Sequence, residues 1–403
     1  MRNCQPIIEV GRVASVDLLR GAAMIVMTLD HVRDLIHHSA MTGLPTDLST
    51  TTPLLFFSRW ITHFCAPTFA LCAGISASLS LQRSGSRAAL SRHLLARGAW
   101  LMFLEVTLMR LIYGFNWSAE YPILLLVLWS FGLGMVALAA FIWIPRLLLG
   151  VLAATIVALH PMLEMVAPAS SGIWAGLWTI IHQAGVVRVG QITLIAPYPM
   201  IPWAAVMALG FAIGPLFAGD KQQRVRWLTI GGVTALSGLA ALRLPNLFGD
   251  PVPWTNQNDP MLTLLSLLNL TKYPASPQFL LLTLGVAALL LAWLDNQLRY
   301  GRIYQVVATF GRTPLFYYVL HFLAAHIIAT AWAFIIYGAA ASTFIFLPYP
   351  SIGGPAGLFP KDFGHSLWAV YMVWIIVLTV CYPVCRRYAR ARSERQQWWL
   401  SYL

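Results

Sequence analysis

The chain has 403 residues, of which 59% are hydrophobic and only 10% are charged. Its mean hydropathy of +0.71 is far above that of an ordinary soluble domain and indicates a polytopic membrane protein. A net charge of +12 would suggest a nucleic-acid partner in a soluble protein, but here the distribution of the basic residues favours a role in membrane orientation. Composition therefore excludes a soluble globular enzyme and makes a nucleic-acid partner unnecessary.

Apolar segments of membrane length recur along the chain and predict an all-α bundle of about ten transmembrane helices. The spans expected in chain order are 13–40, 53–81, 94–113, 120–143, 147–165, a sixth from PYPMIP to 217, 227–242, 276–294, a ninth that begins in GRTPLFYYVLH, and 365–384. Residues 13–387 are expected to form one membrane-embedded domain, with no separate soluble domain.

Basic residues cluster in every second connection when the chain is read as starting in the cytoplasm. The cytoplasmic segments then include the basic stretch 82–93 and a basic tail, 388–403. By the positive-inside rule, both termini are expected to be cytoplasmic in a bacterial-type inner membrane. Residues 1–12 lack an apolar core, so they are expected to be a cytoplasmic segment that precedes a retained first helix.

The connections between spans carry their own signals. Residues 82–93 are expected to be a short basic loop, and 295–311 an interfacial connector. The stretch 167–199 is amphipathic enough to lie in the membrane interface. The three prolines of PYPMIP favour an extended start to the sixth span. In the second span, Gly74 is part of a small-residue face suited to close helix contact.

The first expected helix, 13–40, combines membrane length with many charges. At 100° per residue its polar side chains fall on one arc and its leucines, isoleucine and valines mostly on the other. The polar arc contains Asp17, Arg20, Thr28, His31, Asp34 and His38. Because ionisable groups are expensive to keep in a membrane, this arc is by default a functional-site hypothesis that faces a wet or protein-lined interior.

Asp30, His31, Arg33 and Asp34 form the first candidate catalytic cluster. An imidazole titrates near neutrality, and a nearby carboxylate can hold its tautomer and raise its basicity, as a general base requires. The alternative is a charge network at the outer interface that only anchors the helix. Arg33 lies on the apolar side and is expected to snorkel.

Two further pairs lie at the ends of the first helix. His37 and His38 reach the outer water boundary, where either could act as acid, base or acyl carrier, or could simply be solvated. At the cytoplasmic start, Asp17 and Arg20 are spaced for an i, i+3 ion pair. Alternatively, Arg20 could meet a phosphate that enters from the cytosol.

Polar residues from other spans are expected to converge on the first helix and to bind substrate. These are His63, Glu105, Lys272, Arg312, Tyr317 and His321. Glu105 could equally be a structural partner of Arg97 or Arg110, and His321 a hydrogen-bonded core histidine. The remaining tyrosines and tryptophans are typical of aromatic belts and packing.

Motifs of soluble enzymes are missing from the sequence. No Walker loop, dinucleotide-binding glycine motif, HExxH or nucleophile elbow lies in a suitable context. The five cysteines show no zinc spacing. The sequence therefore predicts a metal-free histidine and carboxylate site in the membrane, open to both sides.

Several strings together resemble the bacterial branch of the heparan-alpha-glucosaminide N-acetyltransferase family, within the wider transmembrane acyltransferases. They are RVASVDLLRGAAMIVMTLDHVRD, RWITHFCAPTFALCAG, RGAWLMFLEVTLMR, YPMIPWAAVMALG, LTKYPASPQFLLLTLG and GRTPLFYYVLH. They run through most of the chain in the same order.

The resemblance implies transfer of an acetyl group from cytosolic acetyl-CoA to a sugar acceptor across the membrane. The position matching Asp30 is asparagine in the eukaryotic lysosomal enzyme, and its important histidine follows in the outer loop, where His38 or His37 is nearest; His31 remains a competing choice. The large lumenal segment of the lysosomal enzyme has no counterpart here, so we expect an envelope glycan as acceptor in place of heparan sulfate.

We therefore expect acetyl-CoA to bind beside Arg20, with its thioester directed toward His31. Asp30 or Asp34 would assist a histidine that deprotonates the acceptor or carries the acetyl group. Direct transfer, a covalent histidine intermediate and homo-oligomerisation all stay open. The alternative function is a proton-coupled transporter of a sugar or lipid-linked intermediate that uses the same buried charges as a relay.

Overall fold

The computed structural model describes residues 13–394 except 42, 119–120, 166–171, 297–300, 353 and 356. The expected cytoplasmic segment 1–12 and residues 395–403 of the expected tail lie outside this part. The α-helices are α1 Ala14–Ile36, α2 Pro53–Trp60, α3 Cys65–Ser84, α4 Arg87–Leu104, α5 Arg110–Gly114, α6 Val127–Phe141, α7 Arg146–Leu159, α8 Ile173–Ile181, α9 Met200–Ile213, α10 Lys221–Arg243, α11 Pro260–Leu268, α12 Pro277–Asn296, α13 Arg302–Arg312, α14 Pro314–Tyr337 and α15 Leu367–Glu394.

The chain is a polytopic membrane helix bundle, which confirms the predicted fold class. Within the described residues, seven helical segments are long and apolar enough to cross a membrane. The prediction of about ten spans is not confirmed at that number. Two of the other expected spans are α1, which carries several charges, and α6, which has 15 residues.

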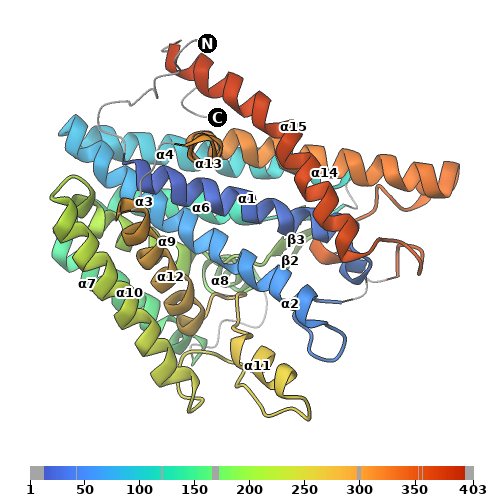
Figure 1. Cartoon of the computed structure of the whole chain (residues 1–403), viewed down its shortest axis with the longest axis horizontal. Helices are drawn as coiled ribbons and strands as arrows, with labels where there is room; N and C mark the ends of the chain where they lie inside the picture. Colours follow the sequence, from blue (N-terminus) through green and yellow to red (C-terminus); the bar gives the residue numbers. More distant parts are fainter. Residues whose placement is uncertain are drawn as a thin grey trace.

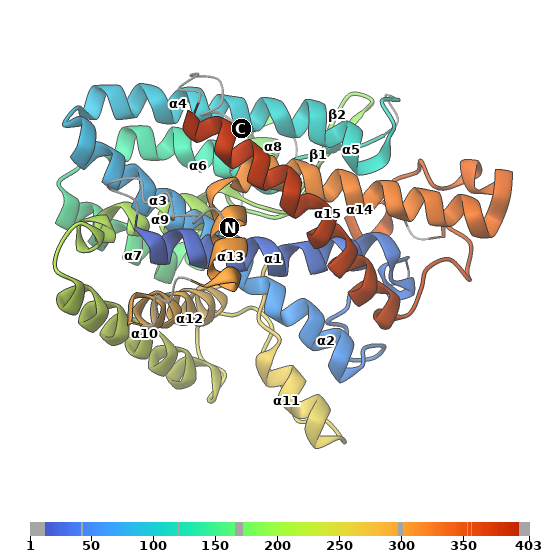
Figure 2. The ribbon, with the colours of Figure 1, turned by 45° about the horizontal axis from the view of Figure 1, so that its top comes forward.

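Helix α1 runs through the middle of the bundle (Figure 1). It packs against α3, α12, α13, α14 and α15, and the rotated view in Figure 2 also places it among these helices. Both its polar and its apolar sides are largely buried, so α1 meets protein on most of its surface. A charged helix is tolerable there, because neighbouring helices supply partners that lipid cannot.

Glycines allow α13 to lie directly on α1. A Cβ atom at Gly21 would come within 1.9 Å of the Val307 carbonyl oxygen, and one at Gly311 within 1.8 Å of the Asp17 carbonyl oxygen. The expected small-residue face of α3 is confirmed, since a Cβ at Gly74 would lie 1.9 Å from the Met207 carbonyl oxygen of α9. Small residues at such contacts let helix backbones approach closely.

Some connections that were predicted as loops from their polar composition contain helices, because capping residues allow helices to end and begin there. The predicted basic loop 82–93 is mostly helical: α3 ends at Ser84, Gly85 takes a left-handed φ of 65°, and Ser86 accepts a bond from the Ala89 amide to start α4. The connector 295–311 contains helix α13. Pro202 lies in the first turn of α9, where its missing N–H is tolerated, so the extended start ends at Pro199.

A small sheet also escaped prediction. Strand β2 (Gly185–Val189) pairs antiparallel with β3 (Ile192–Ala196), and β1 (Ile123–Leu124) pairs parallel with β3 in the order β1-β3-β2. Val187 and Ile123 both lie opposite Leu194. The expected interfacial stretch therefore consists of α8 followed by a hairpin in the described residues.

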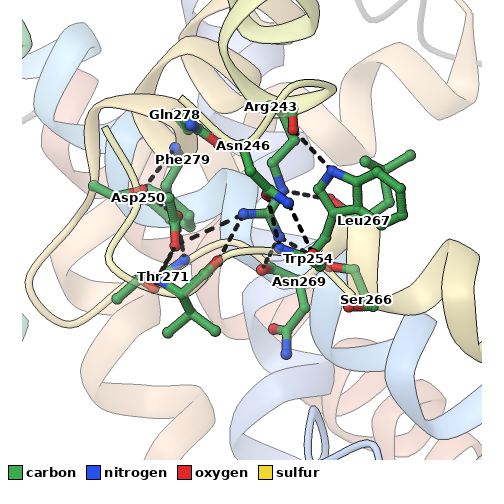
Figure 3. A network of polar contacts seen from close by, with 12 residues as sticks. Arg243, Asn246, Asp250, Trp254, Ser266, Leu267, Asn269, Thr271, Gln278 and Phe279 are labelled. Carbon is green, nitrogen blue, oxygen red and sulfur yellow. Dashed lines mark hydrogen bonds and ion pairs between the residues drawn. The ribbon is translucent and has the colours of Figure 1, made fainter. Parts of the chain in front are cut away.

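Arg243, at the end of α10, holds the loop between α10 and α11 in place (Figure 3). Its guanidinium donates to the carbonyl oxygens of Val252, Ser266, Leu267 and Asn269 at 2.8–2.9 Å. Val252 precedes α11, Ser266 and Leu267 belong to its last turn, and Asn269 follows it, so one side chain fixes α11 and the segment that leads into α12.

Candidate functional site

The polar residues of α1 fall into two clusters, one near each end of the helix. Asp17 and His31 are separated by about 21 Å along the helix axis at 1.5 Å per residue. We call these ends of the bundle the Asp17 end and the His37 end.

A cavity of about 420 Å³ opens at the Asp17 end, a volume typical of ligand sites. Its titratable lining is almost entirely basic. The basic side chains that line it are Arg20, Arg83, His93, Arg97, Arg312 and Arg392, with Asp17 as the acidic one. The cavity is therefore suited to a polyanionic ligand.

Arg20 is fixed in the cavity wall by several contacts. It donates to Asp17 Oδ1 at 3.4 Å, to Ser76 Oγ at 2.9 Å and to the Gly311 carbonyl oxygen at 3.2 Å. Arg312 Nε lies 3.8 Å from Asp17 Oδ2. The predicted ion pair between Asp17 and Arg20 is confirmed, and it stands on the cavity surface, so this geometry is compatible with both of its expected roles.

The cavity lining runs along α1 from basic to apolar residues. Met24 and Met27 line the cavity about one and two turns beyond Arg20, and Phe69, Phe131, Leu128 and Tyr318 belong to the lining as well. A cavity with basic and apolar parts fits a ligand with an anionic head and a long neutral arm. Sequence reasoning missed Arg83, His93, Arg97 and Arg392, although the i, i+4 spacing of His93 and Arg97 on α4 signals a shared face.

His31 forms a dyad with His321 of α14. Nδ1 of His31 lies 2.7 Å from Nε2 of His321, and Nδ1 of His321 lies 2.8 Å from the Tyr317 carbonyl oxygen. Because a carbonyl only accepts, His321 carries its proton on Nδ1, and His31 then donates from Nδ1 to His321. Nε2 of His31 keeps its lone pair, as a general base or nucleophile requires.

This arrangement differs from the expected carboxylate–histidine pair, because the partner of His31 is another imidazole. Tyr317 contributes its carbonyl to His321 and its hydroxyl to Thr28 Oγ1, at 2.5 Å. The tyrosine therefore fixes both α14 and α1 at this depth. The sequence predicted that Tyr317 and His321 converge on the first helix but gave no means of pairing His321 with His31.

Tyr318 connects the dyad to the cavity. Its ring meets the His31 ring edge-on at 5.9 Å between centroids, and it also lines the cavity. Its hydroxyl lies 3.1 Å from that of Tyr113, which donates to Glu105 Oε1 at 2.8 Å. A continuous set of side chains therefore leads from the cavity toward Glu105.

Glu105 has other partners than the expected Arg97 or Arg110. Its Oε2 accepts from the amides of Leu128 and Trp129, at 2.8 and 3.2 Å, and so caps the start of α6. It opens a π-helical segment, Glu105–Met109, a local widening that is frequent at functional sites. Glu105 supports the site without reaching the dyad directly.

Asp30 is the anchor of a charge cluster at the His37 end. Its carboxylate accepts from Arg59 Nη1 at 2.6 and 2.5 Å and from Thr62 Oγ1 at 2.8 Å, and it pairs with Arg33. Arg33 also donates to Asp34 at 2.9 Å. The expectation that Arg33 snorkels is wrong, since its side chain is 0% exposed and ion-paired on both sides.

Sequence reasoning also missed Arg59 as a member of this cluster. The residue is close to His63 in sequence, but its pairing with Asp30 joins α2 to α1 and depends on tertiary packing. Arg59 Nη2 also donates to the Tyr273 hydroxyl at 3.3 Å. The cluster thereby extends to the segment that precedes α12.

Lys272 completes the His37 end of the site. It is 8% exposed, and its ammonium lies 5.2 Å from the ring centroid of Tyr273 and 5.8 Å from that of Tyr198. It interacts electrostatically with Asp30, His31 and His63. His63 is buried against Phe279 at 5.4 Å between ring centroids, and its Nδ1 has no partner within the described part of the chain.

His37 and His38 lie just beyond α1 and differ in environment. His37 Nδ1 accepts from the Ser39 amide at 3.1 Å, and burial, with His38 and Arg33 nearby, lowers the pKa of His37 to about 4. His38 is exposed, and its Nδ1 donates to the His365 carbonyl oxygen at 3.2 Å, which leaves Nε2 as the acceptor. His38 is thus exposed to water, whereas His37 is engaged in a local turn.

The predicted residues therefore assemble into two connected regions. Asp17, Arg20 and Arg312 share the cavity, and His31 and His321 form the dyad beyond Tyr318. Asp30, Asp34, Lys272 and His63 belong to the His37 end, where Asp30 and Lys272 act electrostatically on His31. Glu105 lies behind Tyr113, and His38 is exposed beyond the end of α1. In the described residues, no three His, Cys, Asp or Glu side chains gather as a metal site would require.

Comparison with known proteins shows the family to which this chain is related. A family model described as heparan-alpha-glucosaminide N-acetyltransferase, catalytic, matches residues 12–247. The match spans more than half of the chain and includes α1, Arg59 and Glu105; Lys272, Arg312, Tyr317 and His321 follow it in sequence. No curated protein matches the chain.

Proposed function

The chain belongs to the heparan-alpha-glucosaminide N-acetyltransferase family, and from this premise we propose that it moves an acetyl group from cytosolic acetyl-CoA to a sugar or envelope glycan outside the cytoplasm. The membership makes it a transmembrane acetyltransferase; the donor, acceptor and direction are our proposal. The observation that carries the proposal is the basic cavity whose lining includes Tyr318, the neighbour of His31.

The basic and apolar parts of the cavity lining match the two parts of acetyl-CoA. Phosphates of the nucleotide head would pair with the cavity arginines, since guanidinium groups bind phosphate oxygens bidentately. The pantetheine arm would lie along the apolar residues Met24 and Met27 and bring the thioester toward Tyr318. This orientation makes the Asp17 end cytoplasmic and agrees with the positive-inside rule applied to an inner membrane.

The dyad provides the base for acetyl transfer. An acceptor hydroxyl or amine that approaches from the His37 end gives its proton to Nε2 of His31 while its oxygen or nitrogen attacks the thioester carbonyl. The carbon–sulfur bond breaks, and the CoA thiolate leaves toward the cavity. His321 holds the His31 ring in the tautomer that this step needs.

A covalent route uses the same atoms in two steps. Nε2 of His31 first takes the acetyl group and releases CoA, and the acceptor then removes the acetyl group from the imidazole. Exposed His38 is the competing carrier, because its Nε2 is also free. The two routes differ in whether label from acetyl-CoA stays on the protein without an acceptor.

Incubation of the purified protein with radiolabelled acetyl-CoA tests the proposal. We expect labelled product with a glycan acceptor and stabilisation by CoA in a thermal-shift titration. His31→Ala is expected to abolish transfer and keep CoA stabilisation. Arg20→Gln is expected to weaken the stabilisation by about tenfold in apparent affinity, as loss of a charged hydrogen bond predicts.

Arg302→Gln is the matched control, because Arg302 is an exposed arginine at the start of α13, the helix that ends at Arg312. It should leave the CoA titration unchanged. Indifference of the wild-type protein to CoA, together with proton-driven sugar uptake in vesicles, would contradict the proposal and favour a transporter.

A further inference from the structure

Lys272 is a buried cation without a directly bound counter-ion in the described residues. Only 8% of the residue is exposed, and its ammonium contacts the rings of Tyr273 and Tyr198, whereas Asp30 acts on it electrostatically without forming an ion pair or hydrogen bond with it. Buried charges are normally paired, because removal of water must be compensated. Lys272 therefore lacks the partner that its burial demands.

The neighbouring carboxylates are already occupied. Both oxygens of Asp30 accept from Arg59, and one of them also accepts from Thr62. Asp34 pairs with Arg33, which pairs with Asp30 as well. Three cations and two carboxylates thus meet at the His37 end, and the surplus positive charge resides on Lys272.

The backbone on both sides of Lys272 is held rigidly. Asp250 accepts from the Thr271 amide at 2.9 Å, from the Thr271 hydroxyl at 2.8 Å and from the Ser276 hydroxyl at 2.7 Å. Arg243 fixes Asn269 through its carbonyl oxygen at 2.9 Å. Figure 3 shows Asp250, Thr271, Asn269 and Arg243 in one network. Lys272 thus projects from a backbone that is anchored before and after it.

An exposed aromatic ring lies beside the Lys272 ammonium. Tyr273 is 36% exposed, and its ring meets that of Tyr198 edge-on with 5.0 Å between centroids. The two hydroxyls lie 2.9 Å apart. An exposed ring beside polar hydroxyls is suited to the apolar face and hydroxyl edge of a sugar.

We propose that the acceptor carries an anionic group, a carboxylate or a phosphate, which pairs with Lys272 while its sugar ring lies against Tyr273. This inference rests on the proposed function and narrows its substrate class from glycans in general to acidic glycans. The anion supplies the missing counter-ion, and its attachment at Lys272 places the sugar at the His37 end, where Lys272 acts electrostatically on His31. Lys272 is a binding and specificity residue in this role.

Matched sugars test the inference without requiring the natural acceptor. Glucuronate is compared with glucose, and glucosamine 6-phosphate with glucosamine, as ligands in thermal-shift titrations and as acetyl acceptors. We expect the wild-type protein to prefer the anionic member of at least one pair by tenfold or more, since hydrogen bonds to charged groups are worth about that factor. The pair that shows the preference distinguishes carboxylate from phosphate.

Lys272→Met should reduce the preference for the anionic sugar over its neutral counterpart to about threefold or less. Lys272→Arg should retain this preference. Lys361→Met is the matched control, because it removes the same charge from an exposed loop and should keep the wild-type preference. A wild-type protein that treats both members of each pair alike overturns the inference, as does an undiminished preference in Lys272→Met.

Failure of the inference is distinguishable from failure of the proposed function. If acetyl transfer from acetyl-CoA occurs with equal efficiency to neutral and anionic sugars, the acetyltransferase proposal stands and the acidic acceptor is wrong. If the anionic sugars stabilise the protein through Lys272 but CoA neither binds nor donates, the anion subsite stands and the acetyl donor is wrong.

Discussion

His31 and His321 are joined by a 2.7 Å contact between Nδ1 of the first ring and Nε2 of the second. The Tyr317 carbonyl accepts from Nδ1 of His321, so Nε2 of His321 is the acceptor and Nδ1 of His31 is the donor in the contact between the two rings. His321 thus has the position that a carboxylate holds in many histidine-based sites. It is a neutral partner there, and α14 supplies it.

Replacement of His321 should reduce turnover more than substrate binding. His321→Ala removes the partner that orients His31, and we expect kcat to fall by about a hundredfold, at the lower end of what a positioned base contributes. His321→Gln can still donate to the Tyr317 carbonyl and accept from His31, so it should retain about tenfold more activity than His321→Ala. Steady-state acetyl transfer with pH profiles measures both effects.

The control for His321 is on the same helix. His326 is buried and bonded to the Ile112 carbonyl oxygen, away from the dyad. His326→Gln should leave the pH profile of kcat in place even if it lowers stability. Equal activity of His321→Ala and His321→Gln would contradict a role for the hydrogen bonds of His321 in positioning His31.

Asp30 should be the most sensitive charge at the His37 end. Asp30→Asn leaves Arg33 and Arg59 without their shared carboxylate, and loss of one partner of a buried ion pair costs about 3 kcal/mol in free energy of unfolding. Denaturation in a fixed detergent measures this loss. Asp47→Asn, at an exposed position before α2, should change the free energy by less than about 0.5 kcal/mol.

The double variant Asp30→Asn with Arg59→Gln isolates the interaction. It should be more stable than the sum of the single changes predicts, by at least about 1 kcal/mol, because the second change removes the stranded cation. Strict additivity would mean that Asp30 and Arg59 contribute independently.

The sequence predicted that the first helix lies among protein neighbours, for a physical reason. Charges at membrane depth need protein partners, so the polar arc of α1 made Asp17, Arg20 and His31 candidates, and α1 packs against five other helices. The family resemblance is likewise confirmed by the match over residues 12–247. Periodicity located most spans because apolar length is a local property of the chain.

The missing parts of the site depend on tertiary pairing. Arg33 was assigned to lipid because helical periodicity places it on the apolar arc, and only the approach of neighbouring elements shows that this arc is also buried. Arg59 and Tyr273 contact each other across 214 positions of sequence. Periodicity within one segment carries no information about such a pair.

The hairpin of β2 and β3 escaped prediction for a related reason. Its residues lie in a stretch rich in apolar and aromatic side chains, which a membrane-oriented reading assigns to the interface. The pairing of Val187 with Leu194 is local, but the added parallel strand at Ile123 comes from a distant segment. The Glu105 cap on α6 also depends on a contact between two helices.

His37 should make stability depend on pH. Its pKa is lowered from 6.5 to about 4 by burial and by nearby His38 and Arg33, so the unfolded chain takes up the proton first as pH falls. Protonation also removes the lone pair that accepts from the Ser39 amide. The contribution to folding is therefore complete above pH 6.5 and is lost as pH falls from 6.5 toward 4.

His37→Asn tests this dependence, since its amide oxygen can accept from Ser39 without titrating. Melting temperatures of both proteins are compared at steps between pH 7.5 and 4.5. The wild-type protein should lose more stability than His37→Asn over this interval. Parallel curves would show that other groups produce the acid sensitivity.

Gly311 should be irreplaceable at the contact that forms the cavity wall. A Cβ atom there would lie 1.8 Å from the Asp17 carbonyl oxygen and 2.9 Å from the Gly21 amide nitrogen, so α13 would have to move away from α1. Arg20 donates to the Gly311 carbonyl oxygen, and Arg312 follows directly, so this movement also displaces two of the cavity arginines. Gly311→Ala should lower the free energy of unfolding by about 2 kcal/mol, as overpacking of a tight contact does, and weaken CoA binding with it.

Gly301→Ala is the control at the other end of α13, where an added Cβ meets open space. If both alanine variants bind CoA alike in thermal-shift titrations, close packing of α13 on α1 has no part in shaping the cavity.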